Sequence, residues 1–357
     1  MTINRHKVLF LGASYGSLLA TKLALAGHDS TMVCLPEEVE AFNANGAIVR
    51  FPVRGRDGFV EVCTNELPGH VNAAGPDDVD PADFDLVCLA MQEPQYRVPV
   101  VSALVARVAE SGTPAMSIMN MPPLAYLRRI PGLDTRALAD CYTQASVWDA
   151  FDNANITLCS PDPQAFRPPE DPINVLQVTL PTNFKAATFE SEAHNAILRQ
   201  LQSDIESARY EQDGESLELP VKLKVHDSVF VPLAKWAMLL TGNYRCIQNG
   251  EARAIRDAVH SDVDLSRSIY NEVKALCVKM GAAETDLVPF EKYANAADGL
   301  LKPSSAARAI DAGAPFIERV DCLVNTIAAQ HGTPIESVTE TVALVDAKLA
   351  ANRQRTG

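Results

Sequence analysis

The sequence lacks several patterns that define other classes of protein. Its eight cysteines include no Cys-x-x-Cys pair and no regular spacing, so no zinc-binding pattern is visible. We expect no metal site, and buried free thiols in a reducing compartment. No apolar run is long enough to span a bilayer, and the first residues show no apolar stretch before a small-residue cleavage site. The sequence therefore predicts a cytoplasmic protein.

Basic residues are scarce relative to acidic ones. The chain contains 31 lysines and arginines against 45 aspartates and glutamates, which gives a formal net charge of −14. A nucleic-acid-binding protein needs a basic face that neutralises phosphates, and an anionic membrane surface would also repel an acidic protein. An acidic surface is common in soluble proteins, because net charge opposes association. We therefore expect neither nucleic acid nor membrane as a partner.

Apolar residues are ample by contrast. Hydrophobic residues make up 47% of the 357 positions, which predicts sizeable cores, and this length predicts about two domains. Up to about residue 190, strand patterns alternate with helix patterns, as in a parallel, doubly wound sheet. Beyond that point nearly all of the periodicity is helical. The sequence therefore predicts an α/β domain over residues 1–220 and an all-helical domain over residues 221–357.

The opening segment, Lys7 to Leu35, has the pattern of a strand, a small-residue turn, a helix and a second strand. The turn is Gly-Ala-Ser-Tyr-Gly-Ser, where the usual dinucleotide fingerprint is Gly-x-Gly-x-x-Gly. Gly12 corresponds to the glycine of the tight turn and Gly16 to the one that permits close helix–strand packing; the glycine between them is missing. A turn without ligand is the alternative, but the place of the motif at the first strand favours a dinucleotide site, because the helix N-terminus offers N–H groups to phosphate. The expected cofactor contacts are Gly12, Ala13, Ser14, Tyr15, Gly16 and Leu35.

The end of the second strand bears on the choice of cofactor. An NAD enzyme usually carries an acid there, and an NADP enzyme a basic residue nearby. This chain has Leu35, followed by Glu37 and Glu38. Either glutamate could reach a ribose 2′-hydroxyl and would repel a 2′-phosphate, or both could simply stabilise the N-terminus of a helix. We predict NAD or NADP as the cofactor, with NAD favoured; the nearest basic residues in the sequence are Arg54 and Arg56.

A lysine stands in an apolar helical segment of the second half. Lys235 lies within Val-Pro-Leu-Ala-Lys-Trp-Ala-Met-Leu-Leu, and Asn243 follows eight residues later, about two turns on and on a similar face. The lysine stem could lie along the helix with its ammonium at the surface. Alternatively the ammonium is partly desolvated, which lowers the pKa of a lysine toward working pH and suits a proton donor.

Four segments, in this order, resemble the ketopantoate reductase family, in which a Rossmann domain is followed by a helical domain. They are VLFLGASYGSLLATKLALAGH, SIMNM, LAKWAMLLTGN and SSAARAIDAGAPFIERVD. The resemblance implies that Asn120 orients the nicotinamide and takes part in catalysis, that Lys235 is catalytic, and that Asn243 binds substrate. The remaining substrate ligands that it implies are Ser304, Ser305 and Glu318, with Asp321 competing for the role of Glu318.

The chain also departs from the family pattern. Leu239 stands where the family has a second asparagine, Ala90 where it has a lysine, and Pro122 and Pro123 where it has a glycine-containing run. These departures favour a relative that acts on a different substrate. We therefore expect an NAD(P)-dependent dehydrogenase that transfers hydride between nicotinamide and the carbonyl or hydroxyl carbon of a small 2-oxo or 2-hydroxy acid. We also expect a homodimer, formed through the second domain.

Two other functions remain open from the sequence. An opine dehydrogenase-type enzyme would condense an oxo acid with an amine reductively. Such enzymes have a catalytic histidine, and His226 is the one candidate for it in this sequence. A lone histidine before an apolar helix is, however, usually structural. A non-catalytic dinucleotide sensor would explain the missing glycine, Leu239 and Ala90 as loss of function.

Overall fold

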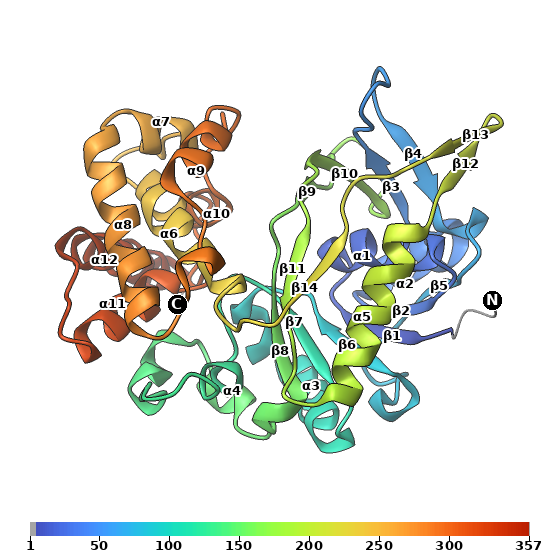
Figure 1. Cartoon of the computed structure of the whole chain (residues 1–357), viewed down its shortest axis with the longest axis horizontal. Coiled ribbons are helices and arrows are strands. Elements are labelled where there is room, and N and C mark those ends of the chain that lie inside the picture. Colours follow the sequence, from blue (N-terminus) through green and yellow to red (C-terminus); the bar gives the residue numbers. More distant parts are fainter. Residues whose placement is uncertain (1–4, 357) are drawn as a thin grey trace. The chain divides into compact units, whose positions relative to one another are not determined.

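The computed structural model describes residues 5–356, whose contacts divide into two compact units (Figure 1). The first unit comprises the described chain up to Met91, Val98–Met119 and Ala150–Asp227. The second unit comprises Gln92–Arg97, Asn120–Asp149 and the chain from Ser228 onward. The sequence-based division at residues 220 and 221 follows the order of the chain, whereas these units interleave along it.

The first unit is built on an eight-stranded sheet in the order β14-β11-β8-β7-β6-β1-β2-β5. Its strands are β1 (Lys7–Leu11), β2 (Asp29–Val33), β5 (Val71–Ala74), β6 (Leu86–Leu89), β7 (Ala115–Ile118), β8 (Ile156–Ser160), β11 (Phe184–Ala187) and β14 (Leu223–His226). Neighbouring strands are parallel except β8 and β11. Because β1 has β2 on one side and β6 on the other, the strand order reverses beside β1, which is where doubly wound sheets bind ligands. The predicted α/β class is confirmed.

Four helices accompany this sheet, and a second sheet adds to it. The helices are α1 (Ser14–Leu25), α2 (Pro36–Asn45), α3 (Pro99–Ser111) and α5 (Glu192–Ser207), with 3₁₀ turns η1 (Thr64–Glu66), η2 (Pro81–Asp83) and η6 (Asn153–Asn155). The second sheet has the order β4-β3-β10-β9, with β3 (Ile48–Phe51), β4 (Val60–Cys63), β9 (Gln164–Phe166) and β10 (Val175–Leu180). A separate hairpin consists of β12 (Tyr210–Gln212) and β13 (Glu215–Leu217).

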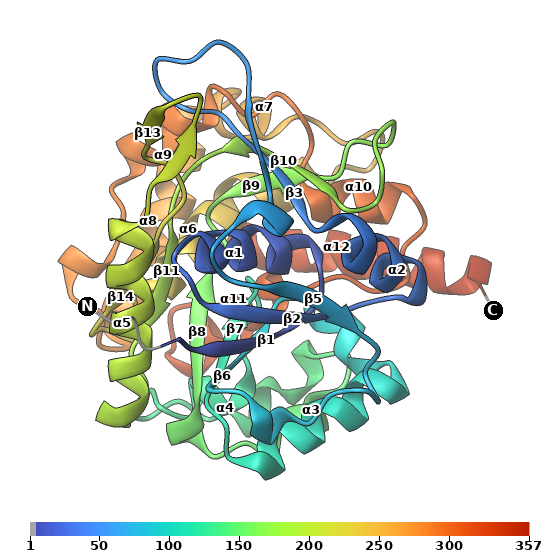
Figure 2. The ribbon, with the colours of Figure 1, turned by 90° about the vertical axis from the view of Figure 1, so that its right-hand side faces the viewer.

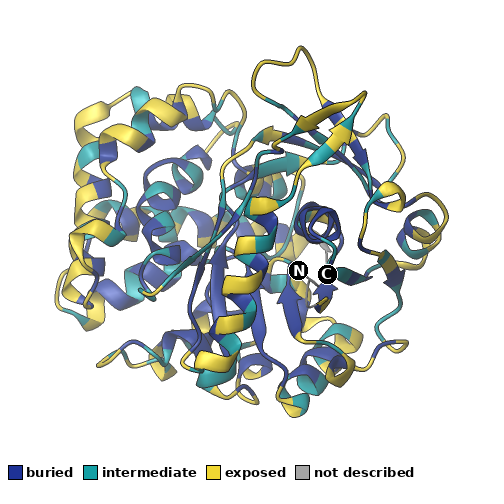
Figure 3. Ribbon diagram, turned by 45° about the vertical axis from the view of Figure 1, so that its right-hand side comes forward, coloured by how far each residue is buried: buried dark blue, intermediate teal, exposed yellow. Residues whose placement is uncertain are grey.

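Helix α1 is buried on every side. It contacts β1 and β2 of the large sheet and β3 and β10 of the small one, as Figure 2 shows. All residues from Gly16 to Leu25 are buried, which explains why the apolar residues of this helix are not confined to one stripe. Its polar residues Ser17, Thr21 and Lys22 are buried as well. Figure 3 shows the strands of the large sheet buried as well. The first turn of α1 is thereby held rigidly at the end of β1.

The second unit is helical. Its helices are α4 (Leu124–Leu127), α6 (Lys235–Met238), α7 (Ile255–His260), α8 (Val263–Lys279), α9 (Phe290–Ala297), α10 (Ser305–Asp311), α11 (Val320–Gln330) and α12 (Glu336–Thr356). Its short turns are η3 (Glu93–Arg97), η4 (Arg136–Cys141), η5 (Ala145–Trp148), η7 (Pro232–Ala234), η8 (Leu239–Asn243), η9 (Tyr244–Cys246) and η10 (Glu284–Asp286). None of the helices within residues 5–356 is long and apolar enough to cross a membrane.

A π-helical turn, η8, stands at the centre of this unit. It packs against α7, α8, α10 and α11. The wider turn changes the backbone hydrogen-bond pattern, and the hydroxyl of Tyr293 donates to the carbonyl oxygen of Met238 at 3.0 Å. At Gly242 a Cβ atom would lie 2.0 Å from that same hydroxyl, so only glycine fits. Such π-helical turns frequently occur at functional sites.

Candidate functional site

The turn after β1 has the geometry that the first glycine of a dinucleotide motif provides. Gly12 has φ of 105°, and a Cβ there would lie 2.5 Å from Cγ of Met91 and 2.9 Å from the carbonyl oxygen of Ala90. Its N–H donates to the carbonyl oxygen of Val33 at 2.9 Å, which holds the turn to the end of β2. Only glycine therefore allows this backbone conformation and this close approach.

Gly16 meets the requirement of the last glycine in the motif. It is buried, and a Cβ would lie 3.3 Å from Cβ of Phe10, so the helix packs directly on the strand. Ala13 is the N-cap of α1 and provides no side-chain cap, while Ser14 is exposed. A helix N-terminus leaves its first N–H groups without intrahelical acceptors. This turn therefore fits the pyrophosphate of a dinucleotide, and it contains the predicted contacts from Gly12 to Gly16.

The end of β2 carries a charge pair that local sequence does not reveal. Leu35 is 60% exposed and is the N-cap of α2, and its N–H donates to Oε2 of Glu38 at 2.9 Å. The other carboxylate oxygen of Glu38 accepts from the Arg167 guanidinium, which also lies over the ring of Phe42. Glu38 therefore stabilises the helix N-terminus, and Glu37 is the exposed acid that follows Leu35.

Arg167 supplies a basic group at this point. It lies 129 positions after Glu38 in the sequence, so no local pattern could identify it. Arg56, one of the two arginines considered from the sequence, forms an ion pair with Glu215 instead.

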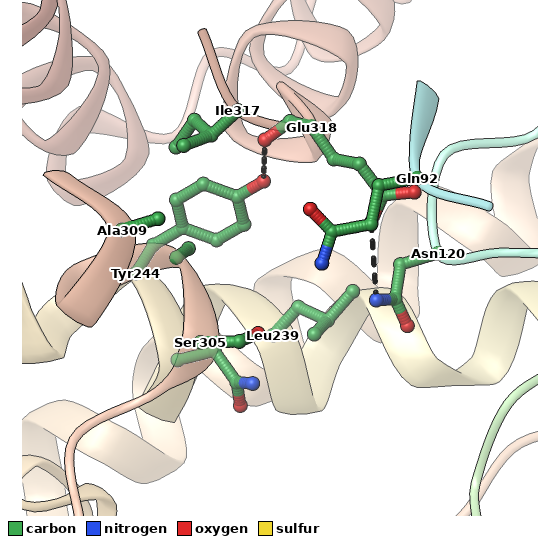
Figure 4. A pocket seen from close by; sticks show the side chains of 10 residues that line it. Gln92, Asn120, Leu239, Tyr244, Ser305, Ala309, Ile317 and Glu318 are labelled. Atoms are coloured by element: carbon green, nitrogen blue, oxygen red, sulfur yellow. Dashed lines mark hydrogen bonds between the residues drawn. The ribbon is translucent and has the colours of Figure 1, made fainter. Parts of the chain in front are cut away.

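A small pocket in the second unit brings together predicted substrate ligands (Figure 4). It has a volume of about 30 Å³, enough for a water-sized group such as one oxygen atom of a carbonyl, hydroxyl or carboxylate group. Its lining residues are Gln92, Asn120, Leu239, Asn243, Tyr244, Ser305, Ala306, Ala309, Ile317 and Glu318. Four of these, Asn120, Asn243, Ser305 and Glu318, are residues that the sequence predicts for the site.

Glu318 is a buried carboxyl group in this pocket. Its Oε2 accepts from Nδ2 of Asn120 at 3.1 Å, and its Oε1 accepts from the N–H of Glu93 at 3.4 Å. Burial raises the pKa of Glu318 to about 7, although the hydrogen bond from Asn120 acts in the opposite direction. Near neutral pH the group is therefore present in both its neutral and its charged forms.

Asp321, the alternative to Glu318, is already engaged elsewhere. It is completely buried and accepts two hydrogen bonds from the Arg319 guanidinium, at 2.9 and 3.0 Å. It does not line the pocket, whereas Glu318 does.

One hydrogen-bond acceptor of Asn120 has no partner in the described part of the chain. Its Oδ1 is buried and has no hydrogen-bond partner within the described chain, although its Nδ2 is bound to Glu318. A buried acceptor without a partner is costly, so a ligand that donates an N–H or O–H group would be favoured here. Nδ2 therefore fixes the orientation of the amide, and Oδ1 is available to accept a hydrogen bond from a ligand.

Ser304 and Lys235 lie close in sequence to the pocket lining but are not part of it. The Ser304 hydroxyl donates to the carbonyl oxygen of Asn243 at 2.7 Å, and it caps α10 by accepting from the N–H of Ala307 at 3.2 Å. It therefore positions Asn243. Lys235 is half-buried at the start of α6, one turn before the lining residue Leu239.

The remaining wall of the pocket is apolar, with neither lysine nor arginine among the lining residues described. Leu239, Ala306, Ala309 and Ile317 contribute hydrocarbon. The hydroxyl of Tyr244 is already satisfied, because it donates to the carbonyl oxygen of Glu318 and accepts from the N–H of Val320. Neutral amide and hydroxyl groups thus supply the polar contacts. Residues 5–356 contain no group of three or more histidine, cysteine or acidic side chains suited to a metal ion.

His226 belongs to the first unit. It is the last residue of β14, pairs with Ala187 of β11, and its carbonyl oxygen accepts from the N–H of Thr188 at 2.9 Å. It does not line the pocket.

Solved structures described as ketopantoate reductases share the fold of this chain. A protein of Ralstonia solanacearum MolK2 assigned as a ketopantoate reductase aligns at a TM-score of 0.68 and 16% identity, over 98% of this chain and 99% of that chain. The 2-dehydropantoate 2-reductase of Methylococcus capsulatus aligns at 0.62 and 15% identity, over 97% of each chain.

A D-mandelate dehydrogenase, solved with NADH and anilino(oxo)acetate, aligns at a TM-score of 0.63 and 12% identity, over 97% of this chain and 99% of that chain. At these identities the likeness establishes the fold. No protein-family model matches the sequence, and no curated protein sequence does.

Proposed function

We propose that the chain is a nicotinamide-dependent oxidoreductase that interconverts a small 2-oxo acid and the corresponding 2-hydroxy acid. The observation that carries this proposal is the pocket in which Asn120, Asn243, Ser305 and Glu318 converge. The turn at Gly12 adds to it, because it places the N-terminus of α1 at the end of β1, where a dinucleotide pyrophosphate would bind.

Each residue has a distinct role in the proposed reaction. A bound reduced nicotinamide would supply hydride to the carbonyl carbon. Lys235 donates the proton to the carbonyl oxygen. The open Oδ1 of Asn120 would accept a hydrogen bond from the nicotinamide carboxamide or from the hydroxyl of the 2-hydroxy acid. Asn243 and Ser305 donate hydrogen bonds to the substrate carboxylate, in a position maintained by Ser304. Glu318, when neutral, allows an anionic substrate to bind beside it.

The pocket wall bears on which 2-oxo acid is used. Leu239 replaces an asparagine of the family pattern, and Ala306, Ala309 and Ile317 continue the apolar surface. An additional hydroxyl on the substrate would lose its hydration there without gaining a partner. We therefore propose a substrate whose side chain is hydrocarbon.

The cofactor is proposed to be NAD rather than NADP. The exposed Glu37 would repel a 2′-phosphate, and the positive charge of Arg167 is neutralised by Glu38. Leu35, as the exposed residue after β2, would lie along the adenosine. A homodimer formed by the helical part of the chain also remains a proposal, and a Staphylococcus aureus ketopantoate reductase of this fold is described as dimeric.

The test uses purified protein with NADH or NADPH and a panel of 2-oxo acids, each with and without amines. We expect cofactor oxidation with an unhydroxylated aliphatic or aromatic 2-oxo acid and no requirement for amine. Turnover only in the presence of amine would indicate opine-type condensation, and cofactor binding without any turnover would indicate a sensor. Absence of binding to either cofactor would refute the proposal.

A further inference from the structure

Two cysteines of the second unit lie unusually close together. The Sγ atoms of Cys141 and Cys322 are 3.1 Å apart, although the residues are separated by 181 positions in the sequence. Both are free thiols; Cys141 is buried, and Cys322 is partly exposed. Because an S–S bond is about 2.05 Å long, a movement of about 1 Å would join them.

The surrounding structure keeps the two thiols next to each other. Cys141 ends η4 and Cys322 lies in the first turn of α11, and these two elements pack together. Asp134 and Gln330 clamp the same two segments at the other end of α11: the N–H of Asp134 donates to Oε1 of Gln330 at 3.3 Å, and Nε2 of Gln330 donates to the carbonyl oxygen of Asp134 at 3.0 Å. The proximity therefore follows from packing along the whole helix.

The environment makes one thiol more acidic than the other. The S–H of Cys141 donates to Sγ of Cys322, and this hydrogen bond lowers the pKa of the Cys322 thiol. The Arg319 guanidinium acts in the same direction, and a position in the first turn of a helix also stabilises a thiolate. The pKa of Cys141 is raised by the same hydrogen bond and by burial. Cys322 is thus the more nucleophilic sulfur and Cys141 its resolving partner.

We propose that Cys141 and Cys322 form a redox-active dithiol that hydroperoxides oxidise to an intrachain disulfide. The Cys322 thiolate attacks one peroxide oxygen, the O–O bond breaks, and the leaving hydroxide takes a proton to become water. The resulting sulfenic acid is attacked by Cys141; the S–S bond forms, the S–O bond breaks, and a second water leaves. The two thiols lose two electrons, and hydrogen peroxide is reduced to two molecules of water.

The dithiol is connected to the pocket through Glu93. Thr143, two residues after Cys141, donates to the Glu93 carboxylate from both its N–H and its hydroxyl, each at 2.9 Å. The N–H of Glu93 in turn donates to Glu318, which stands just before α11. A disulfide would tie together the two segments that hold Glu93 and Glu318. The dithiol itself does not depend on the proposed oxidoreductase function.

The experiment treats the reduced full-length protein with hydrogen peroxide and maps its peptides by mass spectrometry without reduction. We expect a peptide pair linked through Cys141 and Cys322, loss of two titratable thiols, and recovery of both with dithiothreitol. The disulfide closes a loop between residues 181 positions apart, so the oxidised protein should unfold at a higher temperature.

Variants separate the two roles. In Cys141→Ser the link should be absent, and Cys322 should accumulate as a sulfenic acid that dimedone traps. The matched control is Cys63→Ser, which removes a partly buried thiol hydrogen-bonded to a backbone carbonyl and should leave the linked pair unchanged. Two free thiols at Cys141 and Cys322 after treatment that oxidises Cys63, or oxidation of Cys322 to sulfinic acid in the wild type without the linked pair, would overturn the proposal.

Discussion

The side-chain amide of Asn120 donates to the carboxyl group of Glu318 at 3.1 Å, across 198 positions of the sequence. The first residue follows β7 and the second precedes α11, yet both line one pocket. This contact fixes the amide so that its Oδ1 has no partner within the described chain. It thereby couples the protonation of a buried acid to the orientation of the amide oxygen proposed to accept from the nicotinamide or from a 2-hydroxy acid.

Glu318→Gln should remove a pH dependence of stability. The pKa of Glu318 is raised from 4.5 to about 7 in the folded state, so the folded protein binds the proton more tightly than the unfolded one. Stability from this group is therefore full below about pH 4.5 and is lost as pH rises toward 7, by up to about 3 kcal/mol. In urea unfolding between pH 5 and 8, the free energy of unfolding of Glu318→Gln should increase relative to that of the wild type as pH rises. The control Glu340→Gln, which changes an exposed glutamate, should show no such relative increase. Parallel profiles would contradict this.

The same substitution should change substrate binding if the proposed function is correct. Ionised Glu318 would repel a carboxylate in the pocket, so KM for a 2-oxo acid should rise above about pH 7 in the wild type. In Glu318→Gln the KM profile should be flat over the same range. The measurement is initial-rate kinetics at saturating cofactor, and a wild-type KM that stays constant with pH would exclude an anionic substrate group beside Glu318.

Lys235→Ala should reduce turnover with little effect on cofactor affinity. A proton donor acts mainly in the transition state, so kcat should fall roughly a hundredfold or more. The dissociation constant of the reduced cofactor, measured by calorimetry, should change little. Lys292→Ala removes an exposed lysine from α9 and provides the control. A near-normal kcat in Lys235→Ala would show that Lys235 is not the proton donor, and His226 would be tested next.

Gly16→Val should abolish dinucleotide binding. Even a Cβ at this position would lie 3.3 Å from Cβ of Phe10, and a branched side chain would separate α1 from β1 at the expected pyrophosphate. Gly16→Ala adds the Cβ alone and should weaken binding less. Calorimetric titration with NADH gives the affinities, and circular dichroism shows whether the fold persists. Equal affinity for NADH in the wild type, Gly16→Ala and Gly16→Val would show that this turn does not bind the cofactor.

Arg167→Met should strengthen the preference for NADH over NADPH. The substitution leaves the Glu38 carboxylate without its cation, and the added negative charge near a 2′-phosphate would cost about 1 kcal/mol, or roughly fivefold in affinity. Arg56→Met breaks a pair with Glu215 and should leave the ratio unchanged. The ratio of the two dissociation constants is the readout. Tighter binding of NADPH than of NADH by the wild type would reverse the cofactor assignment.

Lys22→Met should stabilise the protein most at or below neutral pH. Lys22 is buried in α1, and burial lowers the pKa of its ammonium from 10.5 to about 7, so the unfolded chain holds this proton more tightly. Wild-type stability should therefore rise as pH increases from about 7 to 10.5. The substitution also leaves the carbonyl oxygen of Leu219 without its donor, so the informative quantity is the pH slope of the unfolding free energy. A slope unchanged by Lys22→Met would contradict the shift.

Much of the fold could be predicted from local patterns. Strands β1 and β6 are short apolar runs in which every residue except Lys7 is buried. The alternation of strand and helix patterns that the sequence predicts up to about residue 190 is interrupted at η4 and η5, two 3₁₀ turns of the second unit. Trp148 of η5 is buried and packs edge-on against Tyr96 of η3, a contact that periodicity does not encode.

The site was predictable only in part. Asn120, Asn243, Ser305 and Glu318 were identified through a family resemblance, and the structure brings them to one pocket. Gln92 and Tyr244 also line it but carry no local signal, since a glutamine in a loop and a tyrosine after an apolar helix are common. Arg167 and the thiol pair were missed because each depends on a contact across more than a hundred residues.

The interleaving of the two units limits how the protein can be divided. A polypeptide that begins at Ser228 would lack Gln92 and Asn120, and with them part of the pocket. It would also lack Trp148 and Cys141, which are buried in the intact chain. The second unit therefore cannot be expressed as the continuous fragment from Ser228 onward with its core complete, whereas a fragment ending at Asp227 would contain all segments of the first unit. Ribosomal synthesis must deliver residues from beyond Ser228 before the early segments Gln92–Arg97 and Asn120–Asp149 find their partners. Until then these segments present apolar surface that chaperones would recognise.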